Sequence, residues 1–306
     1  MISKRISLAR QHIAIHIAGV REIIIEYLHG FEGECVLELK GHSQCVAVVT
    51  ALNTTQVASG SCDSNVCVWD CETGKCLHTL RGHTGAITAL AVCKRGILAS
   101  ASRDGTVRLW NPVSGKSRGT LHEQMFAVSV VAATLDGNLA THDDDSILIY
   151  DVLKGTRLQE IACHVEEPVH SLICLRNGGF LACSEDGEQA WRSSQKLFDD
   201  YGQFITAVVV ISETKIAVAT ASGEVFVFNN RQRVVECRAP CGSGIRALAY
   251  FDGLLVATCL DQELHVWVEE DGTNIQNITE VGSLYLAVMP NKVLVTSNGN
   301  DLQVWM

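Results

Sequence analysis

One stretch of the chain, GHTGAITALAVCKRGILASASRDGTVRLW, combines the three residue types of a serine hydrolase: His83, Ser100 and Asp104. In such an enzyme an exposed serine is activated by the histidine, which acts as its base. A matching set occurs 41 positions earlier (83 − 42 = 41): His42, Ser59 and Asp63. Catalysis needs one activated serine and gains nothing from a second copy at a fixed offset, so the repetition favours a structural role.

The elements that carry these residues are repeated along the whole chain. Written in rows of about 40 residues, the sequence aligns with itself, and the repeats begin near residues 1, 41, 82, 121, 163, 201, 241 and 282. Each row has short apolar runs separated by Gly, Asn, Asp and Ser, which predicts strands joined by tight turns. Four-stranded units bury both faces when they stack around an axis. We therefore expect a single all-β domain over residues 1–306.

Two rows share a set of short motifs. These are the pairs Gly41-His42 and Gly82-His83, the pair Trp69-Asp70, and the turn sequences SGSCDSNVCVWD and SASRDGTVRLWN. In these motifs and in its period, the sequence resembles the WD-repeat family of β-propellers. The other rows are degenerate, and Tyr150 and Phe228 replace the tryptophan in two of them.

The resemblance implies a WD-repeat β-propeller of four-stranded antiparallel blades, and two blade counts compete. The first forty residues fit the repeat, because HGFEGECVLEL from His29 aligns with DCETGKCLHTL from Asp70, so we favour eight blades. In the alternative there are seven. Cys35 to Lys40 then supplies the outer strand that the last row lacks after Trp305, and residues 1–30 form an extra hairpin.

The resemblance also gives the repeated polar residues a role. Trp110 would donate to Ser100, Ser100 would bond His83, and His83 would bond Asp104 in the turn. The preceding repeat offers Trp69, Ser59, His42 and Asp63 at the same offsets. Such a chain pairs buried polar groups and ties down loops. We therefore interpret both sets as structural tetrads and expect no catalytic residue.

In this family, the loops before the first strand and between the second and third strands rim one mouth of the central channel. By alignment, the candidate partner-binding residues there include Arg246, Phe204 and His170. Phe126 and Met125, which precede the first strand of their row, and Arg103, beside the turn aspartate, are further candidates. Aromatic residues, Met and Arg are enriched in interface hot spots. Arg246 is the best single candidate, because its guanidinium is costly to bury unpaired and could clamp a carboxylate or phosphate.

Composition bears on other classes of protein. The net charge is −10 with no dense basic run, so we expect no nucleic-acid partner. No apolar run approaches about twenty residues, so we expect no membrane insertion. Without an export signal we expect the cytoplasm, with the nucleus as an alternative, and free thiols. Four cysteines fall on separate strands and turns, so we predict no metal site and no cofactor: Cys62, Cys67, Cys71 and Cys76.

Three functional hypotheses follow. The first is a non-enzymatic scaffold or adaptor that binds other proteins or peptides, including acidic or phosphorylated motifs. This hypothesis rests on the family resemblance. The second is a substrate- or ubiquitin-recognising module of the ubiquitin system. The third is a propeller enzyme, for which the sequence offers isolated acids and histidines but no cluster.

Overall fold

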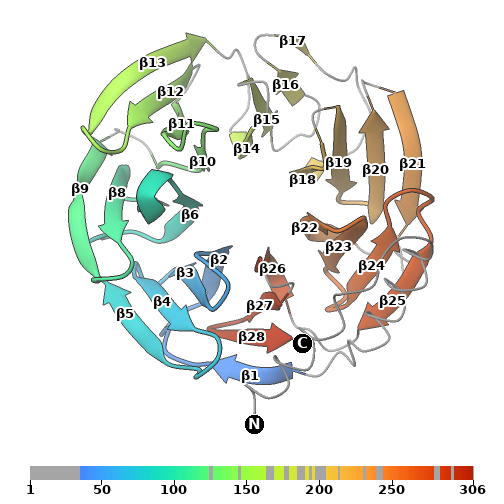
Figure 1. Ribbon diagram of the computed structural model, residues 1–306, viewed down its shortest axis with the longest axis horizontal. Helices are drawn as coiled ribbons and strands as arrows, with labels where there is room; N and C mark the ends of the chain where they lie inside the picture. The colour runs from blue at the N-terminus through green and yellow to red at the C-terminus, as the bar shows by residue number, and fades with distance from the viewer. Residues whose placement is uncertain are drawn as a thin grey trace, which may run out of the picture.

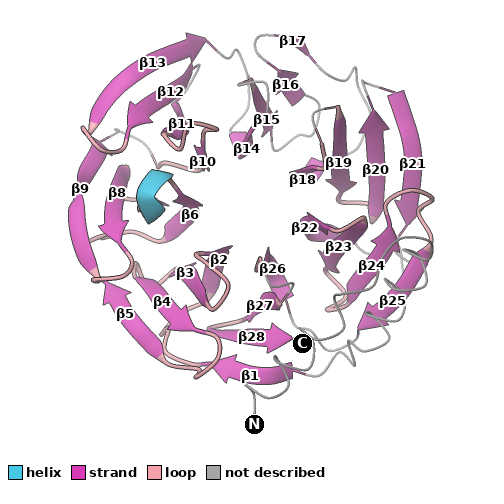
Figure 2. Ribbon diagram, in the orientation of Figure 1, coloured by secondary structure: helices cyan, strands magenta, loops and turns pink. Residues whose placement is uncertain are grey.

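The computed structural model describes residues 35–123, 127–143, 146–162, 169–175, 179–184, 190–192, 195–196, 205–212, 214–229, 232–238, 244–278, 283–290 and 293–305. Within these ranges the regular structure is β throughout, apart from one 3-10 turn, η1 (Lys94–Gly96) (Figure 2). None of the helical structure in this part of the chain is long and apolar enough to cross a membrane.

The strands form seven antiparallel sheets of four strands each, which we number as blades in chain order (Figure 1). Blade 1 consists of β2 (Val46–Ala51), β3 (Gln56–Ser61), β4 (Val66–Asp70) and β5 (Cys76–Leu80). Blade 2 consists of β6 (Ile87–Val92), β7 (Leu98–Ser102), β8 (Thr106–Asn111) and β9 (Lys116–Glu123). Blade 3 consists of β10 (Val131–Ala133), β11 (Leu139–Asp143), β12 (Ser146–Asp151) and β13 (Thr156–Ala162).

Blades 4 to 6 follow the same order from the centre of the ring to its rim. Blade 4 consists of β14 (Val169–Cys174), β15 (Phe180–Ser184), β16 (Ala190–Arg192) and β17 (Gln195–Lys196). Blade 5 consists of β18 (Ile205–Val210), β19 (Lys215–Thr220), β20 (Glu224–Asn229) and β21 (Gln232–Arg238). Blade 6 consists of β22 (Ile245–Phe251), β23 (Leu254–Cys259), β24 (Leu264–Val268) and β25 (Asn274–Ile278).

Blade 7 is built from both ends of the described chain. Its inner strands are β26 (Ser283–Val288), β27 (Leu294–Asn298) and β28 (Asp301–Trp305), and its outer strand is β1 (Cys35–Leu39). β1 runs antiparallel to β28, with Leu39 opposite Leu302 and Glu38 opposite Gln303. The innermost strand β26 packs against both β22 and β2, so blade 7 contacts blades 6 and 1 and the ring is closed (Figure 1).

The expected WD-type propeller of four-stranded blades is present, but the favoured count of eight is wrong. The strand from Cys35 to Leu39 was needed as the outer strand of a first blade, and it is used instead to complete blade 7. β28 would otherwise expose a row of unpaired backbone groups, and β1 pairs with them. The pairing required by the seven-bladed alternative is therefore the one observed. The hairpin proposed for residues 1–30 lies outside the described residues.

The hydrophobic core lies between neighbouring blades. Trp69 of blade 1 is fully buried in a cluster with Leu302 and Val304 of blade 7. Trp110 of blade 2 packs in the same way against Val66 and Val68 of blade 1. Each tryptophan thus fixes the angle between its own blade and the preceding one, because large apolar surfaces are removed from water only when the two sheets stay packed.

The innermost strands share an irregularity near their first residue. The register shifts between Val46 and Val48, between Ile87 and Ala89, and at the same place in β14, β18 and β22. A β-bulge of this kind adds one residue and re-aims its side chain. The added residue is Arg246 in blade 6 and His170 in blade 4. The fold therefore repeats one local distortion around one end of the inner strands.

Candidate protein-binding face

The two repeated polar sets form matching hydrogen-bond chains. In blade 2 the Trp110 indole donates to Ser100 Oγ over 2.8 Å, Ser100 Oγ lies 2.8 Å from His83 Nε2, and His83 Nδ1 lies 2.9 Å from Asp104 Oδ2. Blade 1 has the same distances between its members, Trp69, Ser59, His42 and Asp63. Both serines are fully buried, so neither hydroxyl is available to a substrate.

The aspartate of each tetrad also organises the turn between the second and third strands. Asp104 accepts the backbone N–H groups of Thr84 and Thr106, and so joins the turn to the loop that precedes the blade. Gly105 follows it at a φ of +79°, a conformation that glycine adopts without strain. Burial raises the pKa of Asp104, but the hydrogen bonds from Thr106, Thr84 and His83 outweigh it and hold the pKa below its ordinary value.

The tetrad is incomplete in the last two blades. Trp305 donates to Thr296 Oγ1 over 2.8 Å, so a threonine replaces the serine. In blade 6, Trp267 lies opposite Leu255 as Trp110 lies opposite Leu98, which places Ala257 at the serine position. The buried indole nitrogen of Trp267 consequently has no hydrogen-bond partner.

The structure places two of the candidate binding residues at the same end of the inner strands. Arg246 begins β22 next to Ile245, which pairs with Cys259 at the end of β23, and Arg103 lies in the turn that follows β7. Both are exposed. Neither guanidinium takes part in an ion pair within the described part of the chain.

A tyrosine, Tyr285, lies at the same end of the inner strands as these two arginines. It belongs to β26 of blade 7, where the register shifts between Ser283 and Leu286, and it is 37% exposed. Burial raises the pKa of the Tyr285 hydroxyl, and the positive charges of Arg246 and Arg103 both oppose that shift. Exposed polar side chains from blades 2, 6 and 7 therefore lie at the same end of the ring. We call Arg103, Arg246 and Tyr285 the arginine–tyrosine cluster.

Other exposed groups lie at the same end of the blades. Leu260, in the turn after β23, is 56% exposed, and its N–H donates to the carbonyl oxygen of Gly244. In blade 1 the thiols of Cys45 and Cys62 lie 2.8 Å apart. Neither Tyr285 nor Leu260 was predicted from the sequence to bind a partner. Leu260 could have been found, since it occupies the turn position that Arg103 holds in blade 2.

The remaining candidates cannot be placed in the cluster. Phe204, Phe126 and Met125 lie outside the described residues, and so does the side chain of His170, although its backbone belongs to β14. The four cysteines considered for zinc differ in burial: Cys67 and Cys71 are buried, Cys62 is partly buried and Cys76 is exposed. Desolvation raises the pKa of Cys67 and of Cys71 to about 12, so both thiols stay protonated.

Comparison with known proteins agrees with this geometry. The family model "WD domain, G-beta repeat" matches residues 33–70 and 74–111. These ranges span the closing strand β1, blade 1 and most of blade 2. The chain therefore contains two WD repeats, and its seven-bladed fold has five further blades that this family model does not match. No curated protein sequence matches the chain.

Three solved structures illustrate the likeness in fold. "Structure of U3-55K" has a TM-score of 0.78 at 16% identity, over 88% of this chain and 97% of that one. "Crystal structure of RRP9 WD40 repeats" has a TM-score of 0.79 at 16% identity, over 88% and 96%. "Crystal structure of WD40 beta propeller domain of Doa1" has a TM-score of 0.76 at 15% identity, over 89% and 96%. Identities this low show a shared fold alone.

Proposed function

We propose that this protein is a non-enzymatic scaffold that binds an acidic or phosphorylated peptide at the arginine–tyrosine cluster. The observation that carries the proposal is that two exposed arginines from different blades, Arg246 and Arg103, lie at the same end of the ring with no ion-pair partner in the described part of the chain. Arginine binds carboxylate and phosphate through paired, charge-assisted hydrogen bonds. Tyrosine and arginine are the residue types on which interface affinity usually depends.

The charge of the whole chain supports the choice of cluster. In a protein of net charge −10, two arginines without ion-pair partners in the described structure keep their hydrogen-bonding capacity for a ligand. A neutral or basic ligand would gain nothing from them, whereas an acidic one would pair with both. The cytoplasmic or nuclear location expected from the sequence stays a prediction, and so does the possible role in the ubiquitin system.

The test is a pulldown with the purified, tagged full chain, followed by mass spectrometry. We expect the double variant Arg103→Glu/Arg246→Glu to lose the principal partners while its melting temperature stays within a few degrees of the parent. Lys116→Glu/Arg118→Glu is the matched control, because it makes the same charge change on exposed residues of the outer strand β9. Immobilised ubiquitin is included as a separate bait. Full retention of partners by the folded double variant would place the binding site elsewhere.

A further inference from the structure

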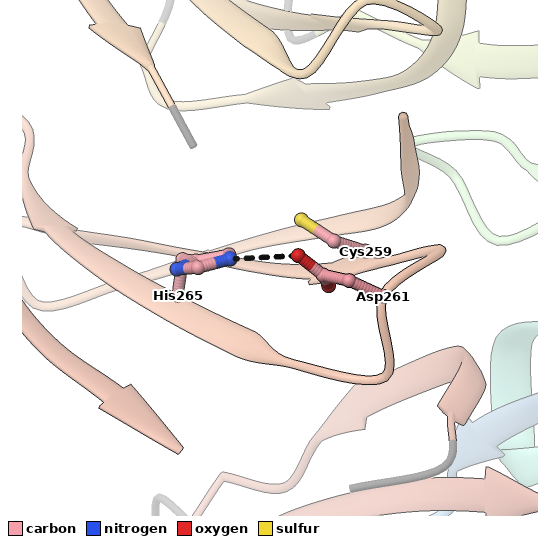
Figure 3. A group of neighbouring side chains, drawn as sticks. All are labelled: Cys259, Asp261 and His265. Atoms are coloured by element: carbon pink, nitrogen blue, oxygen red, sulfur yellow. Dashed lines mark ion pairs between the residues drawn. The ribbon is translucent and has the colours of Figure 1, made fainter. Parts of the chain in front are cut away.

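The turn between β23 and β24 in blade 6 brings three different metal-binding side chains together. Cys259 is 1% exposed, His265 is fully buried, and Asp261 between them is partly exposed. Their ligand atoms all lie within 4.8 Å of one another, and Figure 3 shows the thiol, the carboxylate and the imidazole converging from one hairpin. The partly exposed Asp261 gives an ion a route from solvent to the two buried ligands.

The hydrogen bonding of His265 leaves one nitrogen pointing into this group. Its Nδ1 lies 2.7 Å from Asn277 Oδ1 on β25, and because an amide oxygen only accepts, Nδ1 carries the proton. Nε2 then holds the lone pair. It is buried and has no hydrogen-bond partner. The nearest carboxylate oxygens, on Glu263 and Asp261, lie 3.6 Å and 4.0 Å away, beyond hydrogen-bond distance.

A bound metal ion would explain why His265 Nε2 is buried without a hydrogen-bond partner. An unpaired buried nitrogen costs free energy, and native structures usually pair such groups. Metal-binding histidines commonly donate their second nitrogen to a neighbouring oxygen, which fixes the ring and exposes the lone pair to the ion. The Asn277–His265 pair has this form. In blade 2, by contrast, the turn aspartate Asp104 is held directly by His83.

We propose that Cys259 Sγ, the Asp261 carboxylate and His265 Nε2 bind a zinc ion. Zinc combines sulfur, nitrogen and oxygen ligands at 2.0 to about 2.3 Å, whereas calcium and magnesium prefer oxygen alone. Around a tetrahedral ion such ligands lie about 3.3–3.6 Å apart, so the three groups must approach by roughly 1 Å. Glu263 or a water molecule takes the fourth position. Binding deprotonates the Cys259 thiol and releases one proton to solvent.

The ion would hold the turn aspartate of blade 6 in place, as the tetrad histidine does in blades 1 and 2. There, the aspartate joins the turn to neighbouring segments of its blade through His42 or His83. In blade 6 the ion would join the turn, through Asp261, to the end of β23 and to β24. Cys259 pairs with Ile245, so the fixed hairpin end lies beside Arg246.

The test uses the full chain, reduced with a phosphine and stripped with a chelator, then titrated with Co²⁺ as a spectroscopic substitute for zinc. We expect saturation at one molar equivalent with a thiolate-to-cobalt charge-transfer band in the near ultraviolet. Zn²⁺ should displace the cobalt and raise the melting temperature. Cys259→Ser should abolish the charge-transfer band, and His265→Gln should weaken binding at least tenfold.

Further variants give a clear result even if Cys259→Ser or His265→Gln, both at buried residues, fails to fold. Asp261→Asn changes a partly exposed carboxylate and should weaken binding about tenfold or more, whereas Glu270→Gln, on an exposed carboxylate of the next turn, should have no effect. Cys45→Ser/Cys62→Ser removes two thiols that lie 2.8 Å apart in blade 1 and should leave the band intact. No thiolate band in the reduced, folded parent would overturn the proposal. So would a band of unchanged affinity in Asp261→Asn, or one that depends on Cys45 and Cys62.

Discussion

Buried tryptophans at equivalent positions of blades 2 and 6 have different hydrogen-bond partners. The Trp110 indole donates to Ser100, whereas Trp267 faces Ala257 and has no acceptor. The indole N–H is a strong donor, so its pairing contributes to stability even though most of the side chain is held by packing. The two tryptophans therefore differ in whether the second strand offers a serine hydroxyl, as at Ser100, or an alanine methyl group, as at Ala257.

This difference predicts opposite effects from two small substitutions. Ser100→Ala leaves both the Trp110 indole and His83 Nε2 without a partner and should lower the free energy of unfolding by about 1–3 kcal/mol. Ala257→Ser gives Trp267 an acceptor and should raise it by about 1 kcal/mol. The midpoints of urea denaturation measure both. If Ala257→Ser destabilises the protein as much as Ser100→Ala does, the hydroxyl is not the feature that matters at this position.

The tetrad residues should also make stability depend on pH. Burial lowers the pKa of His83, and Asp104 only partly opposes this shift. As the pH falls, His83 is therefore protonated at a higher pH in the unfolded chain than in the folded one. The contribution of His83 is therefore complete above its ordinary pKa of about 6.5 and is lost as the pH falls toward the lower folded value. Burial raises the pKa of Asp63, but the N–H groups of Ser43 and Asn65 and the His42 ring lower it overall. Its contribution is lost only below about pH 4.

The substitution His83→Gln separates the pH range in which His83 affects stability from the lower range in which Asp63 does. The free energy of unfolding of the parent should fall between about pH 7 and about pH 5, and the variant should show a shallower slope there while keeping the steeper fall below about pH 4. Urea denaturation at a series of pH values gives both slopes. Equal slopes in parent and variant above pH 5 would show that His83 does not carry the upper range.

At the scale of the element, the strands were predictable but some of their pairings were not. Alternating apolar residues and turn sequences located the strands of blades 1 and 2, and the repeat period gave the four-stranded blade. The segment from Cys35 to Leu39 is an outer strand in either count, because its sequence fits that position. Its neighbour is β28, more than 260 residues away (301 − 39 = 262), and no local pattern encodes that choice.

The candidate site shows the same division. Alignment with the clear repeats located Arg246, because every innermost strand from β2 to β22 that shows a bulge has it at the same place. Arg103 was located by its place beside the turn aspartate Asp104. Tyr285 was missed because β26 skips two residues there, between Ser283 and Leu286. His265 was missed because its position carries Arg108 in blade 2 and Cys67 in blade 1, so the repeat itself gives no reason to single it out.

For the whole molecule, ring closure is the main constraint on the chain. Successive blades share hydrophobic clusters, and Leu39 of β1 is fully buried between blades 7 and 1. Unlike an open solenoid, a closed ring leaves no terminal repeat exposed, so each blade is supported on both sides. The β1–β28 pair is the one place where closure depends on strands from opposite ends of the described chain.

A disulfide across this closure should therefore stabilise the protein more than an equivalent one within a blade. Glu38→Cys/Gln303→Cys joins residues that lie opposite each other and closes a segment of 265 residues (303 − 38 = 265). Arg108→Cys/Thr120→Cys is the matched control, since Arg108 and Gln303 both stand two residues before their tryptophan, and it closes only 12 (120 − 108 = 12). Gln303 Oε1 and Arg108 Nε are both buried without a hydrogen-bond partner, so each pair of substitutions removes one unpaired polar atom.

Chain entropy sets the expected size of the difference. Oxidation should raise the free energy of unfolding by about 3 kcal/mol for the control crosslink and by about 5–6 kcal/mol for the ring-closing one, a difference of roughly 2–3 kcal/mol. Urea denaturation of each variant, oxidised and then reduced, measures the gain within one sequence, and mass spectrometry verifies the bond. Equal gains in the two variants would mean that the two ends of the chain stay close together in the unfolded ensemble, so that the longer crosslink removes no additional chain entropy. A loss of stability only in the ring-closing variant would mean that the two strands do not lie in the observed register.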